Sequence, residues 1–238
     1  MSTNKVKGNG LMIRTLALTL LLFAASSNAA IVTVNGTDVK FTYDDATLYG
    51  AGNVIGNTIF FTPSAFKAES TNGTSGTGGL VQTSESLGIT VEALSGSLVM
   101  SAFQLVEDGD YKLTGGGASV SAVGSLAIDS QTSTFSDSAA FNAGALTTSG
   151  GPTPWDAGAT LFLSNTAGWN TDTKVLMTLN NTLSATSLAI GELALIEKKF
   201  SGTAIGLTID MTPVPVPAAA WLFGSALGLL GWMRRKTS

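Results

Sequence analysis

The strongest constraint on the fold of this chain is a series of short segments in which apolar and polar residues alternate. Alternation with a period of two places the apolar side chains on one face of an extended strand and the polar side chains on the other. Clear cases are Val39-Lys40-Phe41-Thr42-Tyr43, Ile89 to Ala93 and Ile205 to Met211. Clusters of Gly, Asn, Ser and Thr separate such segments, as turns do between strands. We therefore predict an all-β body, an antiparallel β-sandwich resembling a jelly roll, over residues 30–212.

Further strands and two long loops complete this prediction. The polar stretch from Ser70 to Gly79 and the Pro- and Gly-containing stretch from Asn142 to Gly158 are expected to be loops. The remaining predicted strands cover residues 31–34, 58–62, 98–106, 111–114, 125–128, 160–163 and 175–180.

Residues 188–200 fit two patterns. Ala189, Leu193, Ile196 and Phe200 recur at helical spacing. Two strands that turn at Ser201-Gly202 also fit, and we favour them over the helix.

The composition excludes several classes of site. The 238 residues include no cysteine and no histidine, so disulfides, cysteine-based metal sites and a Ser-His-Asp triad are impossible. Twelve Lys and Arg stand against sixteen Asp and Glu, a net charge of −4, which argues against nucleic acid as a partner. All sixteen acids lie between residues 30 and 212.

The N-terminal 29 residues have the pattern of a secretory signal. Basic residues precede an apolar run from Thr15 to Ala25, and the small residues Ser27 and Ala29 follow it. We predict recognition by the Sec translocon and cleavage by signal peptidase before Ala30 or one residue later. Translation could begin at Met1 or at Met12.

The C-terminal residues 213–238 form a second distinct segment. Pro213-Val214-Pro215-Val216-Pro217 ends any preceding strand. Sixteen uncharged residues follow, 218–233, and the cluster Arg234-Arg235-Lys236 comes next. We predict a short transmembrane helix over residues 218–233 that keeps the basic cluster in the cytoplasm and the body outside. Its large apolar side chains are Trp221, Leu222, Phe223, Leu227, Leu229, Leu230 and Trp232.

This order of motif, apolar helix and basic cluster resembles the PEP-CTERM sorting signal of Gram-negative bacteria. The motif is Val214-Pro215-Val216-Pro217, with Val216 where the family has its name-giving Glu. The resemblance, which covers about a tenth of the chain, extends through Ala218 to Leu230. It implies recognition by an exosortase, an integral-membrane protease-transpeptidase that would cut near Pro215 to Pro217. Two body segments, 60–66 and 105–113, are also similar to stretches of otherwise uncharacterised proteins with this tail.

Carboxylates are the best candidates for catalysis. Glu107-Asp108-Gly109-Asp110 joins two predicted strands and is interpreted as a solvated turn, with Glu107, Asp108 and Asp110 as alternative Ca²⁺ ligands. Asp44-Asp45 is a second acidic cluster, and Asp156 lies in the second predicted loop. Adjacent strand residues point to opposite faces, so neither cluster is a ready-made acid–base pair.

Two aromatic residues, Trp155 and Trp169, are candidates for stacking on sugar rings. No cofactor is predicted.

Together these features predict a non-enzymatic, exported surface or matrix protein. It would pass through an intermediate anchored in the inner membrane and then reach the cell surface or the extracellular space. A structural or adhesive role linked to exopolysaccharide and biofilm is what the resemblance implies. The alternatives are an extracellular carbohydrate-active enzyme that uses Asp or Glu, and a permanently tail-anchored envelope protein.

Overall fold

The computed structural model describes residues 30–73, 78–163, 166, 168–169, 172–198, 205–214 and 218–236. In these residues the chain forms thirteen strands and one helix, which confirms the all-β prediction for the body. The strands are β1 (Ile31–Asn35), β2 (Val39–Asp44), β3 (Gly52–Ile55), β4 (Thr58–Phe61), β5 (Lys67–Thr71), β6 (Gly79–Ala93), β7 (Leu98–Thr114), β8 (Ser119–Ser130), β9 (Ser136–Asn142), β10 (Thr153–Phe162), β11 (Lys174–Ser187), β12 (Leu193–Glu197) and β13 (Ile205–Pro213), and the helix is α1 (Ala218–Lys236).

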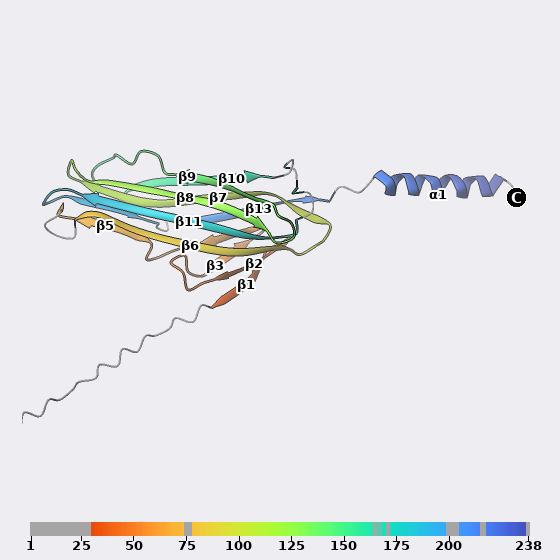
Figure 1. Cartoon of the computed structure of the whole chain (residues 1–238), viewed down its shortest axis with the longest axis horizontal. Helices are drawn as coiled ribbons and strands as arrows, with labels where there is room; N and C mark the ends of the chain where they lie inside the picture. The colour runs from red at the N-terminus through yellow and green to blue at the C-terminus, as the bar shows by residue number, and fades with distance from the viewer. Residues whose placement is uncertain are drawn as a thin grey trace, which may run out of the picture.

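The strands make two antiparallel sheets that lie face to face along the long axis of the body (Figure 1). Sheet A has the order β1-β2-β6-β11-β8-β9. Sheet B has the order β3-β4-β13-β7-β12-β5, and β10 pairs with β7 outside this path. From β6 to β12 the chain passes repeatedly from one sheet to the other, apart from the β8–β9 hairpin. Residues distant in sequence therefore face one another across the core.

Strand β7 is the centre of sheet B. One of its edges pairs with β10 over Ala102 to Tyr111. Its other edge is shared, because β13 pairs with Leu98 to Glu107 and β12 pairs with Asp110 to Thr114. This position gives β7 partners on both sides, so its inward side chains are covered by neighbours as well as by sheet A.

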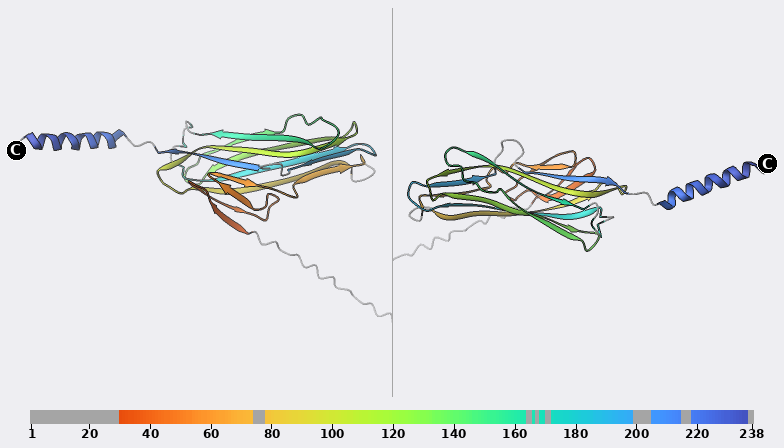
Figure 2. Two further views of the ribbon diagram at one scale, coloured as in Figure 1. Left: turned by 180° about the vertical axis from the view of Figure 1, so that it is seen from behind. Right: turned by 90° about the horizontal axis from the view of Figure 1, so that it is seen from above.

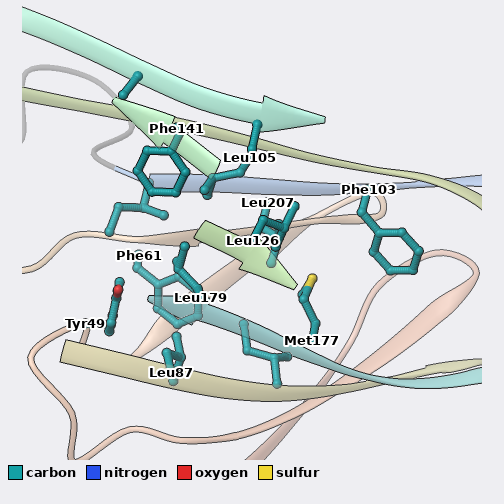
Figure 3. Packing of buried hydrophobic residues seen from close by; sticks show 14 of the residues in the cluster. Tyr49, Phe61, Leu87, Phe103, Leu105, Leu126, Phe141, Met177, Leu179 and Leu207 are labelled. Atoms are coloured by element: carbon teal, nitrogen blue, oxygen red, sulfur yellow. The ribbon is translucent and has the colours of Figure 1, made fainter. Parts of the chain in front are cut away.

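A single hydrophobic core fills the space between the sheets. Alternation in β11 directs Met177 and Leu179 inward, and β7 directs Phe103 and Leu105 inward from the opposite sheet. Figure 3 shows these side chains packed together with aromatic residues such as Phe61. This interdigitation of two inner faces is how a β-sandwich buries its apolar surface.

Four local predictions were wrong. The predicted turn at Glu107 to Asp110 lies inside the continuous strand β7. All four residues pair with β10 on one edge, and on the other edge Glu107 pairs with β13 and Asp110 with β12. The predicted loop over residues 142–158 contains the first part of β10, which begins at Thr153. Residues 70 and 71, predicted as loop, end β5. Strands β3, β5 and β9 were not predicted, since they are short or strongly polar.

Residues 193–197 form strand β12, so the preference for strands over a helix is confirmed there. The predicted turn at Ser201-Gly202 lies outside the described residues, and so does the predicted signal peptide with Ser27 and Ala29. Ala30, at the predicted cleavage site, is the first described residue and is exposed.

Helix α1 covers the predicted apolar segment and the basic cluster, and it stands clear of both sheets (Figures 1 and 2). The prediction that this segment spans a membrane is not supported: within the part of the chain that the structure describes, no helix is both long and apolar enough to cross one. Sixteen uncharged residues rise only about 24 Å, against a hydrocarbon core of about 30 Å, and the three basic residues follow at once.

Candidate functional site

The acidic stretch of β7 is divided between the two faces of sheet B. Glu107 points into the core and is fully buried, whereas Asp108 and Asp110 are only partly buried on the outer face. Gly109 lies between them, and its lack of a side chain leaves room for Trp155 of β10. A Cβ added at Gly109 would lie 2.6 Å from the indole ring. The strand period of two therefore separates one carboxyl group from the others and places it inside the protein.

Each oxygen of the Glu107 carboxyl group accepts a hydrogen bond, one from an amine and the other from an amide. The Lys198 ammonium nitrogen lies 2.5 Å from Glu107 Oε2. Asn181 Nδ2 donates to Glu107 Oε1 at 2.5 Å and also lies 3.2 Å from the Tyr49 hydroxyl. We call Glu107, Lys198, Asn181 and Tyr49 the buried polar cluster.

Both sheets contribute to the buried polar cluster. Asn181 is an inward residue of β11 in sheet A, where it follows Met177 and Leu179 in the apolar alternation. Glu107 comes from β7 in sheet B, and Lys198 directly follows β12, with its backbone N–H donating to Phe66 O at 3.0 Å. Tyr49 lies in the connection between β2 and β3. The cluster therefore bridges the two layers of the sandwich.

The surroundings of the Lys198 amine are aromatic. Its nitrogen lies 5.5 Å from the centre of the Phe66 ring and 5.3 Å from that of Trp155. The Tyr49 ring packs edge-on against Phe66 at 5.5 Å. Both charged side chains have 0% exposure, so aromatic faces take the place of water around this pair.

Burial shifts both members of the pair toward their neutral forms. It raises the pKa of Glu107, and the charge and hydrogen bond of Lys198 oppose that shift. It lowers the pKa of Lys198, and Glu107 opposes that shift in turn. A buried ion pair costs desolvation free energy that mutual attraction only partly offsets. Burial thus shifts this pair toward a carboxylic acid beside a neutral amine, relative to the same groups in water.

The carboxylates on the outer face of sheet B lie in cross-strand pairs. Asp108 is the register partner of Asp156 on β10, and Asp110 is the register partner of Glu197 on β12. Partial burial raises the pKa of Asp108, and the charge of Asp156 adds to the shift. The described residues contain no group of three acidic side chains placed to hold a metal ion. Glu107 is separated from Asp108 and Asp110 by the sheet itself, so the three do not converge on one ion.

A hollow of about 360 Å³ lies over β8 and β9 and contains two carboxylates, Asp129 and Asp137. Asp137 is the register partner of the inward residue Ile128, so Asp137 lies on the inner side of sheet A and Asp129 on the outer side. These two groups do not face each other.

Asp44, from the other acidic cluster, accepts a hydrogen bond from Ala46 N and stabilises the turn after β2.

The two tryptophans considered for sugar stacking are core residues. Trp155 and Trp169 are both buried, and Trp169 Nε1 donates to Met100 O at 2.5 Å. Neither ring face is free to bind a sugar. The stacking hypothesis was therefore wrong for this pair.

The sorting motif begins where the sandwich ends. Val214 N donates to Ser97 O at 2.9 Å, which ties the first residue of the motif to the body. Pro215, Val216 and Pro217 lie outside the described residues, and α1 starts at Ala218. The large apolar residues of α1 from Leu222 to Trp232 are exposed.

The sequence interpretation missed Asn181 and Lys198 and assigned Glu107 to a solvated turn, although a signal for all three exists. Asn181 interrupts the inward series Val175, Met177, Leu179, Leu183 and Ala185, and Glu107 interrupts the inward series Phe103, Leu105, Tyr111 and Leu113. Lys198 continues the inward series of Ala194 and Ile196. A polar residue at an apolar position of an alternating strand is the pattern that would have identified all three.

No known protein family model matches this chain, and no curated protein is significantly similar to it.

Proposed function

We propose that this is an exported, non-enzymatic protein of a bacterial cell surface or extracellular matrix, released from its C-terminal tail by an exosortase. In this proposal the N-terminal 29 residues direct export and are removed. The β-sandwich is the functional part, and the tail brings it to the sorting enzyme in the inner membrane.

The single observation that carries this proposal is the exposure of the apolar side chains of α1. Leu222 is 69% exposed, Phe223 67% and Trp232 58%, while the sandwich beside them buries its own apolar residues in one core. A group of exposed large apolar side chains marks a surface that binds a protein or a membrane. A helix of this kind that ends in Arg234-Arg235-Lys236 suits recognition at the membrane surface.

The junction between body and tail supports cleavage near the prolines. Val214 is held to Ser97 in the body, and the helix begins four residues later. A cut between these points would free a sandwich that keeps all of its strands. The resemblance to the PEP-CTERM signal rests on the same residues, from Val214 to Pro217 and onward.

The outer face of sheet A suits a polysaccharide partner. Neighbouring strands β6, β11 and β8 present uncharged hydrogen-bonding side chains there, around the exposed Val123. Some of them are joined in pairs, such as Ser84 with Thr182 at 2.9 Å and Gln82 with Ser184 at 3.0 Å. Hydroxyl and amide groups can exchange these bonds for bonds to sugar hydroxyls. We call this surface the hydroxyl face: Gln82, Ser84, Ser86, Ser121, Ser125, Asn180, Thr182 and Ser184.

The sandwich is assigned a jelly-roll-like topology as part of this proposal, because the chain passes repeatedly between its two sheets. A structural role is favoured over hydrolysis by the placement of the described carboxylates: Asp108 and Asp156 adjoin on one open face, and Asp129 and Asp137 lie on opposite faces.

Expression in a Gram-negative host with and without an active exosortase tests the proposal. Release of the body into the medium is expected only when the enzyme is active, with the unprocessed chain staying with the cells otherwise. Equal release in both strains would contradict it.

A further inference from the structure

We propose that Lys198 and Asn181 become joined by a covalent side-chain amide, an isopeptide bond, which the folded protein forms by itself with Glu107 as the proton carrier. The bond would connect β11 in sheet A to the residue that follows β12 in sheet B.

The first argument is the arrangement of the three groups. One carboxyl group binds the amine nitrogen of Lys198 on Oε2 and the amide nitrogen of Asn181 on Oε1, both at 2.5 Å. The nucleophile and the amide that it would attack are thus held side by side on one acid. Such fixed proximity replaces a large part of the barrier that separate reactants face in solution.

The second argument is the protonation state that the site favours. An ammonium ion has no lone pair for attack, so the reaction needs a neutral amine. Burial lowers the pKa of Lys198 and raises that of Glu107. Transfer of one proton from Lys198 to Glu107 gives a neutral amine and a carboxylic acid, which are a nucleophile and a general acid.

The third argument is an unsatisfied atom. Asn181 Oδ1 is buried and has no hydrogen-bond partner among the described residues. A half-turn of the amide would exchange Oδ1 with Nδ2 and place the oxygen against protonated Glu107 and the Tyr49 hydroxyl, both of which can donate to it. Two donors on that oxygen would stabilise the negative charge that develops there during attack.

The reaction balances without any co-reactant. The lone pair of Lys198 Nζ attacks Cγ of Asn181 and forms the new C–N bond. Once Cγ is tetrahedral, Nδ2 can turn back to Glu107 and take its proton. The bond from Cγ to Nδ2 then breaks and Nδ2 leaves as ammonia. Glu107 then takes the surplus proton from Nζ. A primary amide and an amine become a secondary amide and ammonia, with no oxidation or reduction.

The product also removes the electrostatic cost of the site. A buried ion pair is replaced by a neutral amide, whose N–H and C=O can bond to Glu107 and Tyr49. Because Phe66 and Trp155 exclude water from the amine, hydrolysis of the new bond is hindered as well.

Peptide mapping of the purified full chain tests the proposal directly. Trypsin, which cuts after Lys and Arg, would release residues 175–198 from an unmodified chain; a bond at Lys198 blocks that site, so cleavage follows Lys199 instead. Further digestion after Glu192 and Glu197 should leave residues 175–192 joined to Lys198-Lys199, lighter than the two separate peptides by one molecule of ammonia. Cleavage after Lys198 in the folded protein, with residues 175–192 recovered alone, would overturn the proposal. Loss of ammonia from Asn181 by ring closure on its own backbone would not count as joining.

Variants identify the role of Glu107. Glu107→Gln keeps the shape of the side chain and removes the acid, so the rate of joining should fall about 100-fold or more. Lys198→Arg and Asn181→Ala should abolish the joined peptide. Glu92→Gln is the matched control, since Glu92 pairs with Lys40 at the surface, and it should leave the joined peptide at the wild-type level. Unchanged joining in Glu107→Gln would overturn the assignment of Glu107.

Discussion

The carboxyl group of Glu107 lies 2.5 Å from the amine of Lys198, with both side chains fully buried between the two sheets. Removing one partner alone leaves the other ionisable group without a partner in an apolar site. This costs more folding free energy than replacing both groups with apolar side chains. Glu107→Ala should lower the free energy of unfolding by about 3–5 kcal/mol. The double variant Glu107→Leu/Lys198→Met should be clearly more stable than Glu107→Ala. Urea denaturation followed by tryptophan fluorescence measures both, and equal stability of the two variants would contradict this account of the pair.

The outer carboxylate Asp108 predicts a pH dependence of the stability of the protein. The pKa of Asp108 is raised in the folded protein, so its protonated form favours folding and its contribution is lost as pH rises through that pKa. Asp108→Asn should therefore stabilise the protein at neutral pH by about 0.2–1 kcal/mol, the range for relieving a like-charged cross-strand pair. The gain should vanish in acid below the ordinary aspartate range. Denaturation midpoints across that pH range check this, and a gain that persists in acid would refute it.

Gly109 should not tolerate a side chain. An added Cβ would meet the backbone oxygen of Glu197 and the Trp155 ring, and such overpacking costs about 1–3 kcal/mol. Gly109→Ala should lower the thermal midpoint, whereas Gly116→Ala, at an exposed position with nothing within 4 Å of the added Cβ, should not. Equal midpoints for the two variants would show that the strand adjusts at Gly109.

The hydroxyl face should contribute to polysaccharide binding. Ser84→Ala with Thr182→Val removes two hydrogen-bonding positions at about 1 kcal/mol each, so the Kd for purified matrix polysaccharide should rise about tenfold or more. Ser95→Ala, in the loop before β7, is the control and should leave the Kd unchanged. Binding measured by co-sedimentation that is equal in all three proteins would rule out this face as the binding surface.

Replacing Pro215 and Pro217 with Ala should block cleavage of the tail, because the pair restricts the backbone to the extended form that a protease would bind. The exposed body residue Pro152, changed to Ala, provides the matched control. Immunoblots of membrane and medium fractions measure the outcome. Normal release of the Pro215→Ala/Pro217→Ala protein would show that the sorting enzyme does not recognise these two prolines.

The sequence predicted the fold class well because alternation is a direct consequence of burying one face of a strand. It failed at residues 107–110, where Asp-Gly is typical of a turn, yet pairing with β10, β12 and β13 keeps the backbone extended. The prediction that Trp155 is free to stack on a sugar was also wrong. The Trp155 ring is buried against Gly109, and this contact follows only from the register between β7 and β10. The buried polar cluster depends on residues of β7 and β11, the residue after β12 and the connection between β2 and β3 meeting in the core, and no local pattern specifies that meeting.

The intact mass of the mature protein, purified from outside the cell, tests the central claim most directly. We predict a polypeptide that begins at or next to Ala30, ends near Pro215 to Pro217 and therefore lacks α1. A mass that still includes Arg234, Arg235 and Lys236 would contradict release by cleavage of the tail.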